Sequence, residues 1–462
     1  MPAVILATPL AATIRRIMRP APDTVRACHR TWATRLARMR WALLASVALA
    51  TAVGVAVATG APARGFYSTP FEKQPAIGTL ADLGRLLFMD PSLSASGVTS
   101  CSSCHDPTRA FGPPDGASVQ RAGVTRVVAG VRAVPSLTYT QTVPAFTEHF
   151  FEDDGDDSED QGPAGGRTWD GRAATVHDQA RLPLQSPLEM ANGTDAEVVS
   201  RVGSAAYAGQ FRAAFGDRFF ETPATAINGI LLALEVFEQS PAEFYPYSSK
   251  YDAWLHGSAS LSAEEERGRK IFNDPMRGNC DRCHPSGVRF GALPQFTDYG
   301  YVALGLPRNA AIPANADPGY FDLGLCGPLR QDLAAHAAYC GLFRTPSLRN
   351  VALRRVFYHN GLVTSLRDAV RFYAERDTHP ERWYPRAANG AILKFNDLPA
   401  SDHRNVEMDV PFGQTAATAG SLSETDIDDL VSFLGTLTDG FRTPEAAASP
   451  PSPAASGSPA RP

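Results

Sequence analysis

Two short motifs constrain this chain more than any other feature: CSSCH at residues 101–105 and CDRCH at residues 280–284. Each holds two cysteines with two residues between them, and a histidine follows the second cysteine directly. This pattern suits covalent haem attachment, in which the thiols add to the haem vinyl groups and the histidine binds the iron. A structural zinc site would need a second cysteine or histidine pair nearby, and a thioredoxin-like redox pair needs no histidine. The motifs therefore predict a di-haem c-type cytochrome. The predicted haem-binding residues are Cys101, Cys104, His105, Cys280, Cys283 and His284.

The sequence around the motifs repeats in order. In both halves a G-R-x-x-F segment precedes the CxxCH motif, and a PSL segment, a turn with Asp-Gly or Asn-Gly and an amphipathic segment follow it. These segments are LGRLLF (83–88), VPSL (134–137) and WDGRAATVHDQA (169–180) in the first half, and RGRKIF (267–272), TPSL (345–348) and HNGLVTSLRDAV (359–370) in the second. Such a repeat indicates duplicated domains. We predict a mainly α fold of two related c-type cytochrome domains, one haem each, packed around an inter-haem interface.

The boundaries of the two domains follow from this repeat. We place the first haem domain at residues 66–240 and the second at 250–441, joined by a loop-rich linker within 238–262. In the second domain, residues 422–441 carry a serine or threonine N-cap ahead of leucines and a phenylalanine at helical spacing, which predicts a closing helix. Residues 442–462 are rich in proline, alanine and serine, which predicts a disordered tail.

The N-terminal segment, residues 1–63, predicts export. Arginines precede an apolar run at 41–60, and the small residues APA follow at 61–63, as in a signal peptide. The run is also long enough to be an uncleaved membrane anchor. Starting at Met39 gives a signal of ordinary length, so residues 1–38 are read as a mis-assigned start or an extension. Both alternatives carry the rest of the chain to the periplasm.

Charge and the remaining cysteines add two smaller predictions. A formal net charge of −5 favours neither nucleic acid nor an anionic membrane surface as a partner. The acidic segment 151–160 is read as a solvated loop in preference to a calcium site or docking surface. Cleavage of residues 1–63 removes Cys28, so only Cys326 and Cys340 lie outside the haem motifs. In an oxidising compartment we expect these two to form a disulfide.

The order of the motifs resembles the bacterial di-haem cytochrome c peroxidase family, including its MauG branch. The motifs are CSSCHDP, PSL, WDGRA, Gln179, SPLEM, CDRCH, TPSLRN, HNG and Tyr373, and they cover roughly residues 66–441. The resemblance implies an enzyme that acts on hydrogen peroxide. It also implies that Glu189 is the acid–base residue at the first haem, and that Gln179 orients water or peroxide. Many members of the family carry a histidine shortly after the first CxxCH, which blocks this iron until the enzyme is reduced. Here no histidine occurs between His105 and His149, so the resemblance implies a five-coordinate first haem that is ready for peroxide.

The second haem is expected to differ from that of the ordinary peroxidases. In those enzymes a methionine fourteen residues beyond the histidine of the HDG turn ligates the iron. Here the same count from His359 reaches Tyr373, as in the MauG branch. A phenolate ligand favours ferric iron and lowers the potential. The alternative is that Tyr373 is a core aromatic residue and Met408 is the ligand. Trp169 stands where the family has a tryptophan between the haems, so we expect it to relay charge, in addition to any packing role.

Two departures concern calcium, which the family holds between its domains. The asparagine expected after the arginine of the R-N-x-P-S-L segment is replaced by Ala133, which leaves calcium doubtful. Asn360 likewise stands where an aspartate is usual.

The resulting hypothesis is a periplasmic or membrane-tethered di-haem peroxidase. It would reduce hydrogen peroxide to water with electrons from a small c-type cytochrome or a copper protein. One alternative is MauG-like, peroxide-driven oxidation of a protein or small-molecule substrate. Another, of a different class, is a non-enzymatic di-haem electron carrier, against which Gln179 and Glu189 argue.

Overall fold

The computed structural model describes residues 69–151, 160–415 and 422–442. The predicted export segment, most of the acidic segment 151–160 and the proline-rich tail lie outside these residues. Within the described ranges, no helix is both long and apolar enough to cross a bilayer. The elements are α2 (Ile77–Met89), α3 (Val176–Gln185), α4 (Asp195–Ser204), α5 (Ala208–Phe215), α6 (Pro223–Glu238), α7 (Pro241–Phe244), α8 (Lys250–Leu255), α9 (Ala263–Asn273), α10 (Leu366–Glu375) and α11 (Glu424–Gly435), with strands β1 (Arg121–Ala122), β2 (Val128–Ala129), β3 (Tyr301–Val302) and β4 (Phe343–Arg344).

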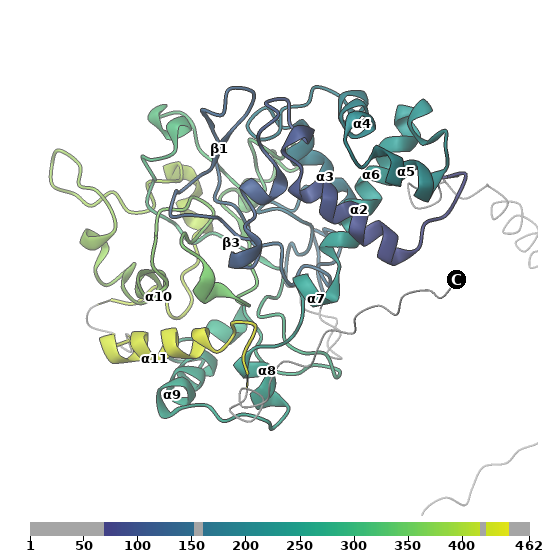
Figure 1. The fold of residues 1–462 in the computed structure, drawn as a ribbon. Coiled ribbons are helices and arrows are strands. Elements are labelled where there is room, and N and C mark those ends of the chain that lie inside the picture. The colour runs from purple at the N-terminus through teal and green to yellow at the C-terminus, as the bar shows by residue number, and fades with distance from the viewer. Residues whose placement is uncertain (1–68, 152–159, 416–421, 443–462) are drawn as a thin grey trace, which may run out of the picture. The chain divides into compact units, whose positions relative to one another are not determined.

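Helices α2 and α6 form the centre of the first half, where they pack along each other (Figure 1). The glycine of the first G-R-x-x-F segment explains this close packing, because a Cβ on Gly84 would lie 2.0 Å from the carbonyl oxygen of Ala233 on α6. The phenylalanine of the same segment, Phe88, is fully buried in the surrounding core. The repeated glycine and phenylalanine therefore specify a helix contact and a core position.

The second half repeats this packing with α9 and α11 (Figure 1). A Cβ on Gly268 would lie 2.0 Å from the carbonyl oxygen of Asp429 on α11, and Phe272 is buried beside it. Helix α11 is the predicted closing helix. Its N-cap is Ser423, whose hydroxyl accepts a hydrogen bond from the Asp426 amide while the Asp426 carboxylate accepts one from the Ser423 amide.

The segments after the two PSL sequences also have the same structure. Residues 167 and 173 form an isolated β-bridge around the WDG turn, and residues 357 and 363 form one around the HNG turn. The turn glycines, Gly171 and Gly361, have φ of +66° and +59°, a region that glycine adopts without strain. Each turn leads into a helix with a hydroxyl N-cap, Thr175 for α3 and Ser365 for α10. The amphipathic segments predicted from the repeat are thus α3 and α10.

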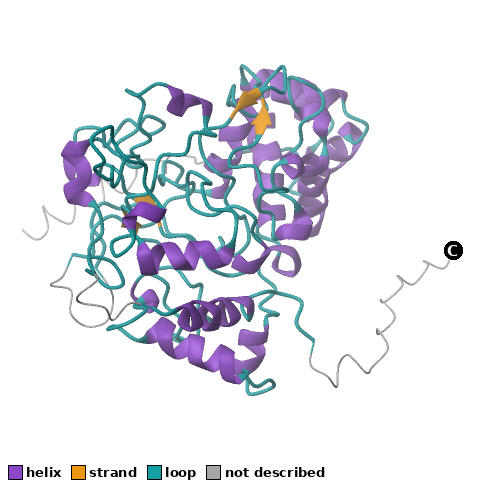
Figure 2. Cartoon of the chain, turned by 90° about the vertical axis from the view of Figure 1, so that its left-hand side faces the viewer, coloured by secondary structure: helices purple, strands orange, loops and turns teal. Residues whose placement is uncertain are grey.

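Loops make up much of the chain between the helices, and the strands are two-residue pairs (Figure 2). Strand β1 pairs antiparallel with β2, and β3 with β4. The interpretation of 238–262 as loop-rich was wrong in part, since this segment contains α7 and α8. Helix α8 starts at a reciprocal cap between Ser249 and Asp252. The disulfide predicted between Cys326 and Cys340 is present.

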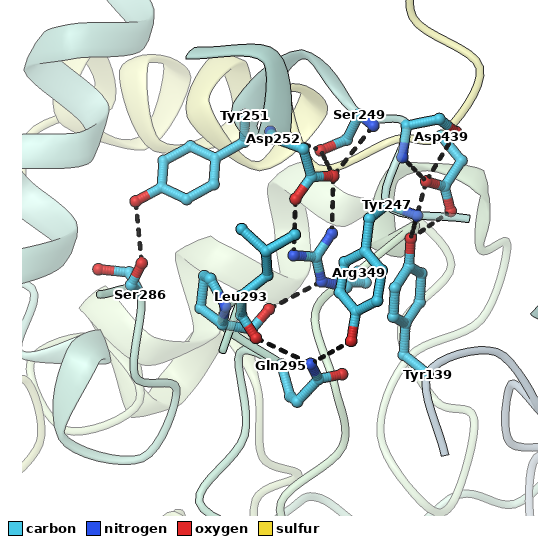
Figure 3. Close-up of polar contacts among 12 residues, drawn as sticks. Tyr139, Tyr247, Ser249, Tyr251, Asp252, Ser286, Leu293, Gln295, Arg349 and Asp439 are labelled. Carbon is cyan, nitrogen blue, oxygen red and sulfur yellow. Dashed lines mark hydrogen bonds and ion pairs between the residues drawn. The ribbon is translucent and has the colours of Figure 1, made fainter. Parts of the chain in front are cut away.

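A buried ion pair ties the segment 245–252 to both halves of the chain (Figure 3). The guanidinium of Arg349 donates to both carboxylate oxygens of Asp252 at 2.9 Å, and the two side chains are 0% and 2% exposed. The rings of Tyr139 and Tyr247 lie 4.6 and 4.7 Å from the guanidinium carbon. The hydroxyl of Tyr139, in the first half, donates to the carboxylate of Asp439 near the end of the second. Residues from four parts of the sequence thus meet around one buried cation.

Candidate active site

The first CxxCH motif forms a tight turn that fixes the orientation of its histidine. Residues Cys101–Ser103 make a single 3-10 turn. The Nδ1 atom of His105 lies 2.9 Å from the carbonyl oxygen of Phe111. Because a carbonyl can only accept, Nδ1 carries the proton and Nε2 is left to bind a metal. Burial lowers the pKa of His105 to about 4, so the ring is neutral, as a ligand must be.

The second motif repeats this geometry. Residues Cys280–Arg282 form the turn, and Nδ1 of His284 lies 2.8 Å from the carbonyl oxygen of Phe296. Burial lowers the pKa of His284 to about 4 as well. The two acceptor residues, Phe111 and Phe296, both have positive φ, 52° and 54°, which is uncommon for a bulky side chain. The shared strain indicates that both loops are built to present a carbonyl to the histidine.

A cavity lies beside the first motif. It is lined by Cys101, Cys104 and His105, and also by Gln179 and Glu189. His105 is the only histidine among the described residues that line it. The structure thus brings together the residues that the sequence predicts at the first haem.

Glu189 reaches this cavity from the segment after α3. Its amide donates to the Ser186 carbonyl at 3.0 Å, and its own carbonyl accepts from the Gly123 amide at 2.8 Å. Gly123 has φ of +74°, and a Cβ there would lie 2.8 Å from the Pro187 carbonyl oxygen, so only glycine allows the β1–β2 hairpin to pack this closely. Glu189 lines the cavity and is itself exposed by surface area. The surrounding protein nevertheless withdraws water from its carboxyl group, which raises its pKa, an effect that Arg172 opposes.

Gln179 lies on α3, one helical turn after its N-cap Thr175. Its backbone amide donates to the Thr175 carbonyl at 3.0 Å. A side chain on a capped helix has a well-defined direction, which suits a residue that orients a small ligand in the cavity.

A second cavity lies beside the second motif and is lined by Cys280, Cys283, His284 and Tyr373. Tyr373 projects from α10, and its ring stacks on Phe412 with the ring centroids 5.1 Å apart. Its hydroxyl makes no hydrogen bond to any residue that the structure describes. Burial and the nearby thiols raise the pKa of Tyr373 above its ordinary value. A half-buried phenol with no hydrogen-bond partner among the described residues, beside a predicted haem, is suited to binding iron.

Met408, the alternative ligand, lies elsewhere. Its side chain is 51% exposed, and it is absent from the described residues that line the second cavity. Its sulfur accepts a hydrogen bond from Nη2 of Arg376 at 3.4 Å. The geometry therefore favours Tyr373.

Trp169 lines both cavities. It is buried, and its indole Nε1 donates to the carbonyl of Ala133 at 2.8 Å. Its own carbonyl accepts from the amide of Arg344 at 2.9 Å, which fixes it to strand β4 of the second half. The side chain thus stands between the two sites, where a charge relay would have to be.

Comparison with known proteins gives this arrangement a family. A model of the di-haem cytochrome c peroxidase family matches residues 79–260. The methylamine utilization protein MauG of Paracoccus denitrificans is 33% identical over 391 residues, which cover 80% of this chain and 91% of that protein. The chain belongs to the di-haem cytochrome c peroxidase family. The cytochrome c551 peroxidase of Pseudomonas aeruginosa is 29% identical over 65% of this chain and 73% of its own length.

A solved structure agrees with this assignment. The diheme peroxidase BthA of Burkholderia thailandensis is 37% identical and superposes with a TM-score of 0.69, over 81% of this chain and 89% of that one. The predicted fold, mainly α with two cytochrome domains, is confirmed. The chain is thus a di-haem peroxidase, an oxidoreductase that carries two c-type haems and reduces hydrogen peroxide.

The second cavity of this peroxidase fits a haem in one further respect. Arg344 and Arg354 line it, and burial lowers the pKa of both, to about 10 for Arg354. Neither guanidinium has a carboxylate partner among the described residues. Haem carries two propionate carboxylates, which would form ion pairs with the guanidinium groups of these two arginines. When bound, the two haems supply the redox-active iron through which electrons reach peroxide.

Sequence reasoning missed Glu238, a second carboxylic acid that lines the first cavity of the peroxidase. It lies at the end of α6 and is buried. Burial raises its pKa to about 8, with Glu235 adding to the shift and Arg167 opposing it. The signal in the sequence is the pair Glu235 and Glu238 near the end of a mostly apolar helix. At neutral pH this group is mostly protonated.

The calcium expected between the domains of this family finds no cluster of acidic ligands here. The described residues hold no group of three or more histidine, cysteine, aspartate or glutamate side chains that could bind a metal. Arg132, next to Ala133, donates to Asp170 at 2.7 Å and to Asp322 at 2.6 Å, so these carboxylates are already paired. Asn360 donates to Asp397 at 3.0 Å. Calcium binding stays doubtful.

Proposed function

We propose that the cavity beside His105 is where the peroxidase binds and cleaves hydrogen peroxide. The observation that supports this most is the presence of Gln179 and Glu189 in a cavity whose lining, among the described residues, contains no histidine besides His105. No second imidazole is available there to block peroxide. A five-coordinate first haem, which needs no reductive activation, is part of this proposal.

Glu189 would move the proton in this reaction. Its carboxylate accepts a proton from the peroxide oxygen that approaches the iron and returns it to the departing oxygen, which leaves as water. With two further protons and two electrons, the remaining oxygen atom would also become water, so that one hydrogen peroxide gives two waters. The amide of Gln179 would orient the peroxide or the water. The raised pKa of Glu189 suits a group that must both take up and release a proton during the reaction.

At the second site, Tyr373 would ligate the iron and Trp169 would pass charge between the sites. This arrangement favours storage of an oxidising equivalent at the second haem. The electron donor would be a small c-type cytochrome or a copper protein. We further propose that residues 1–63 direct export to the periplasm. The disulfide between Cys326 and Cys340 supports an oxidising compartment.

The test of the reaction is stoichiometric. We expect the fully oxidised enzyme, mixed with peroxide and reduced c-type cytochrome, to oxidise two cytochromes for each peroxide consumed. If peroxide instead yields a long-lived oxidised form of the protein that reduced cytochrome does not discharge, the cytochrome-dependent proposal fails. MauG-like oxidation of a protein or small molecule, which Tyr373 favours, would then take its place.

The assignment of Tyr373 has its own test. In a Tyr373→Phe variant we expect the second haem to lose a ligand and change its visible and EPR spectra from low-spin to high-spin. Tyr358→Phe is a matched control, because Tyr358 lines the same cavity but donates its hydroxyl to the Ala369 carbonyl at 2.8 Å. If the second-haem spectrum is unchanged in Tyr373→Phe, or if it changes to high-spin in Met408→Leu, then Tyr373 is not the ligand.

A further inference from the structure

Arg354 is a half-buried cation with no carboxylate partner among the described residues. Its Nε donates to the carbonyl of Val356 at 3.2 Å and its Nη2 to the carbonyl of Val134 at 3.1 Å. These carbonyls come from the second and the first half of the chain. No ion pair among the described residues includes Arg354. A guanidinium that is partly withdrawn from water and meets only carbonyls is costly, so a structure that retains one has reason to do so.

The surroundings of Arg354 supply that reason. The side chain lines the second cavity together with Cys280 and His284. The Nη1 atom of Arg354 lies close to Gly112: a Cβ placed on this glycine would be 3.6 Å from Nη1. Gly112 follows Phe111, whose carbonyl holds Nδ1 of His105.

The charge of Arg354 therefore acts on both haem sites. Its guanidinium lines the wall of the second cavity. Its Nη1 atom also lies toward Gly112, the residue after Phe111, whose carbonyl oxygen is 2.9 Å from Nδ1 of His105. In an interior of low dielectric constant the effect of a charge extends over several ångströms.

We propose that Arg354 is a cation shared by the two haem sites. Its guanidinium donates to a propionate carboxylate of the haem attached at Cys280 and Cys283. Through its position behind the Phe111 loop, its charge also sets the potential of the haem held by His105. Arg354 is thus a positioning and tuning residue rather than a catalytic one. Its role does not depend on the roles proposed for Glu189 or Tyr373.

The sign of the effect follows from charge. Oxidised haem iron carries one more positive charge than reduced iron, so a nearby cation disfavours the oxidised form and raises the potential. Loss of the Arg354 charge should therefore lower both potentials, because both haems lose a repulsive charge.

Arg344 provides the matched control. It is also a half-buried guanidinium without a carboxylate partner among the described residues, and desolvation by the surrounding protein lowers its pKa. It lines the second cavity but not the first, and its Nε donates to the Thr168 carbonyl at 3.2 Å. None of its hydrogen bonds to the described residues reaches the loop of Phe111 and Gly112 that holds His105.

The experiment is a potentiometric titration of the intact di-haem protein, with each haem followed by its own absorption bands. In Arg354→Gln we expect both potentials to fall. In Arg344→Gln we expect only the second-haem potential to fall. An Arg354→Lys variant, which keeps the charge and loses the planar fork, should leave the first-haem potential near that of the wild type; it also provides the test if the glutamine variant does not fold.

Every other outcome overturns the proposal. If Arg354→Gln moves only the second potential, the charge is not shared. If it moves only the first, there is no carboxylate contact at the second haem, and if it moves neither, Arg354 has no role toward haem. A first-haem potential that falls as far in Arg354→Lys as in Arg354→Gln would show that charge is not the cause.

Discussion

Replacement of Glu189 by glutamine is expected to slow peroxide reduction by about 100- to 10,000-fold, the usual contribution of general acid–base catalysis. Glutamine keeps the size and polarity of the side chain but cannot accept the peroxide proton. The rate of peroxide cleavage by the oxidised enzyme, measured by stopped flow, should fall while the spectra of both haems stay unchanged. Loss of haem spectra in the variant would instead indicate a structural role.

The pH profile supplies a second readout of the same substitution. The surrounding protein raises the pKa of Glu189, so the carboxylate form that accepts the first proton is lost as pH falls through this raised value. The wild-type rate should therefore fall on the acid side, and this limb should be absent in Glu189→Gln.

Glu238 is the matched control, since it is a second carboxylic acid that lines the same cavity. Its pKa, raised to about 8 by burial, keeps it mostly protonated at neutral pH, so glutamine closely imitates its normal state. Glu238→Gln should leave the rate at pH 7 within a few-fold of the wild type. If it slows the reaction as much as Glu189→Gln does, the acid–base role does not belong to Glu189 alone.

The parts of this site that could be predicted from sequence are those fixed by local pattern. The CxxCH spacing specified both haem-binding turns, and the G-R-x-x-F repeat specified Gly84 and Gly268, where two helices meet too closely for any side chain. Ser423 and the leucines after it specified helix α11. In each case the residues that matter lie within a few positions of one another.

The parts that could not be predicted depend on packing between distant segments. Arg354 and Glu238 look like ordinary surface charges in the sequence, and only the fold places them in the walls of the haem cavities. The segment 238–262 looked like a linker because it is rich in serine and tyrosine. Its helix α8 is stabilised by Arg349, which lies 97 residues from Asp252.

The Arg349–Asp252 pair leads to the largest stability effect that we expect. Replacement of Arg349 by methionine should lower the free energy of unfolding by about 3–5 kcal/mol, because it leaves the carboxylate of Asp252 buried without its partner. The loss would be measured as a shift in the urea midpoint of the holoprotein. Arg349 also donates to the Pro294 carbonyl at 2.8 Å, so the loop before Phe296, whose carbonyl holds His284, should loosen as well.

Two further variants separate burial from the mere presence of an ion pair. Arg367 also binds two acidic side chains, Asp428 and Glu424, both at 2.6 Å, but the group is exposed to solvent. Arg367→Met should therefore shift the midpoint far less, because water solvates the remaining carboxylates. The double variant Arg349→Met, Asp252→Leu should recover part of the loss, since it leaves no buried charge without a partner. Equal shifts in Arg349→Met and Arg367→Met would mean that burial is not what makes the Arg349 pair important.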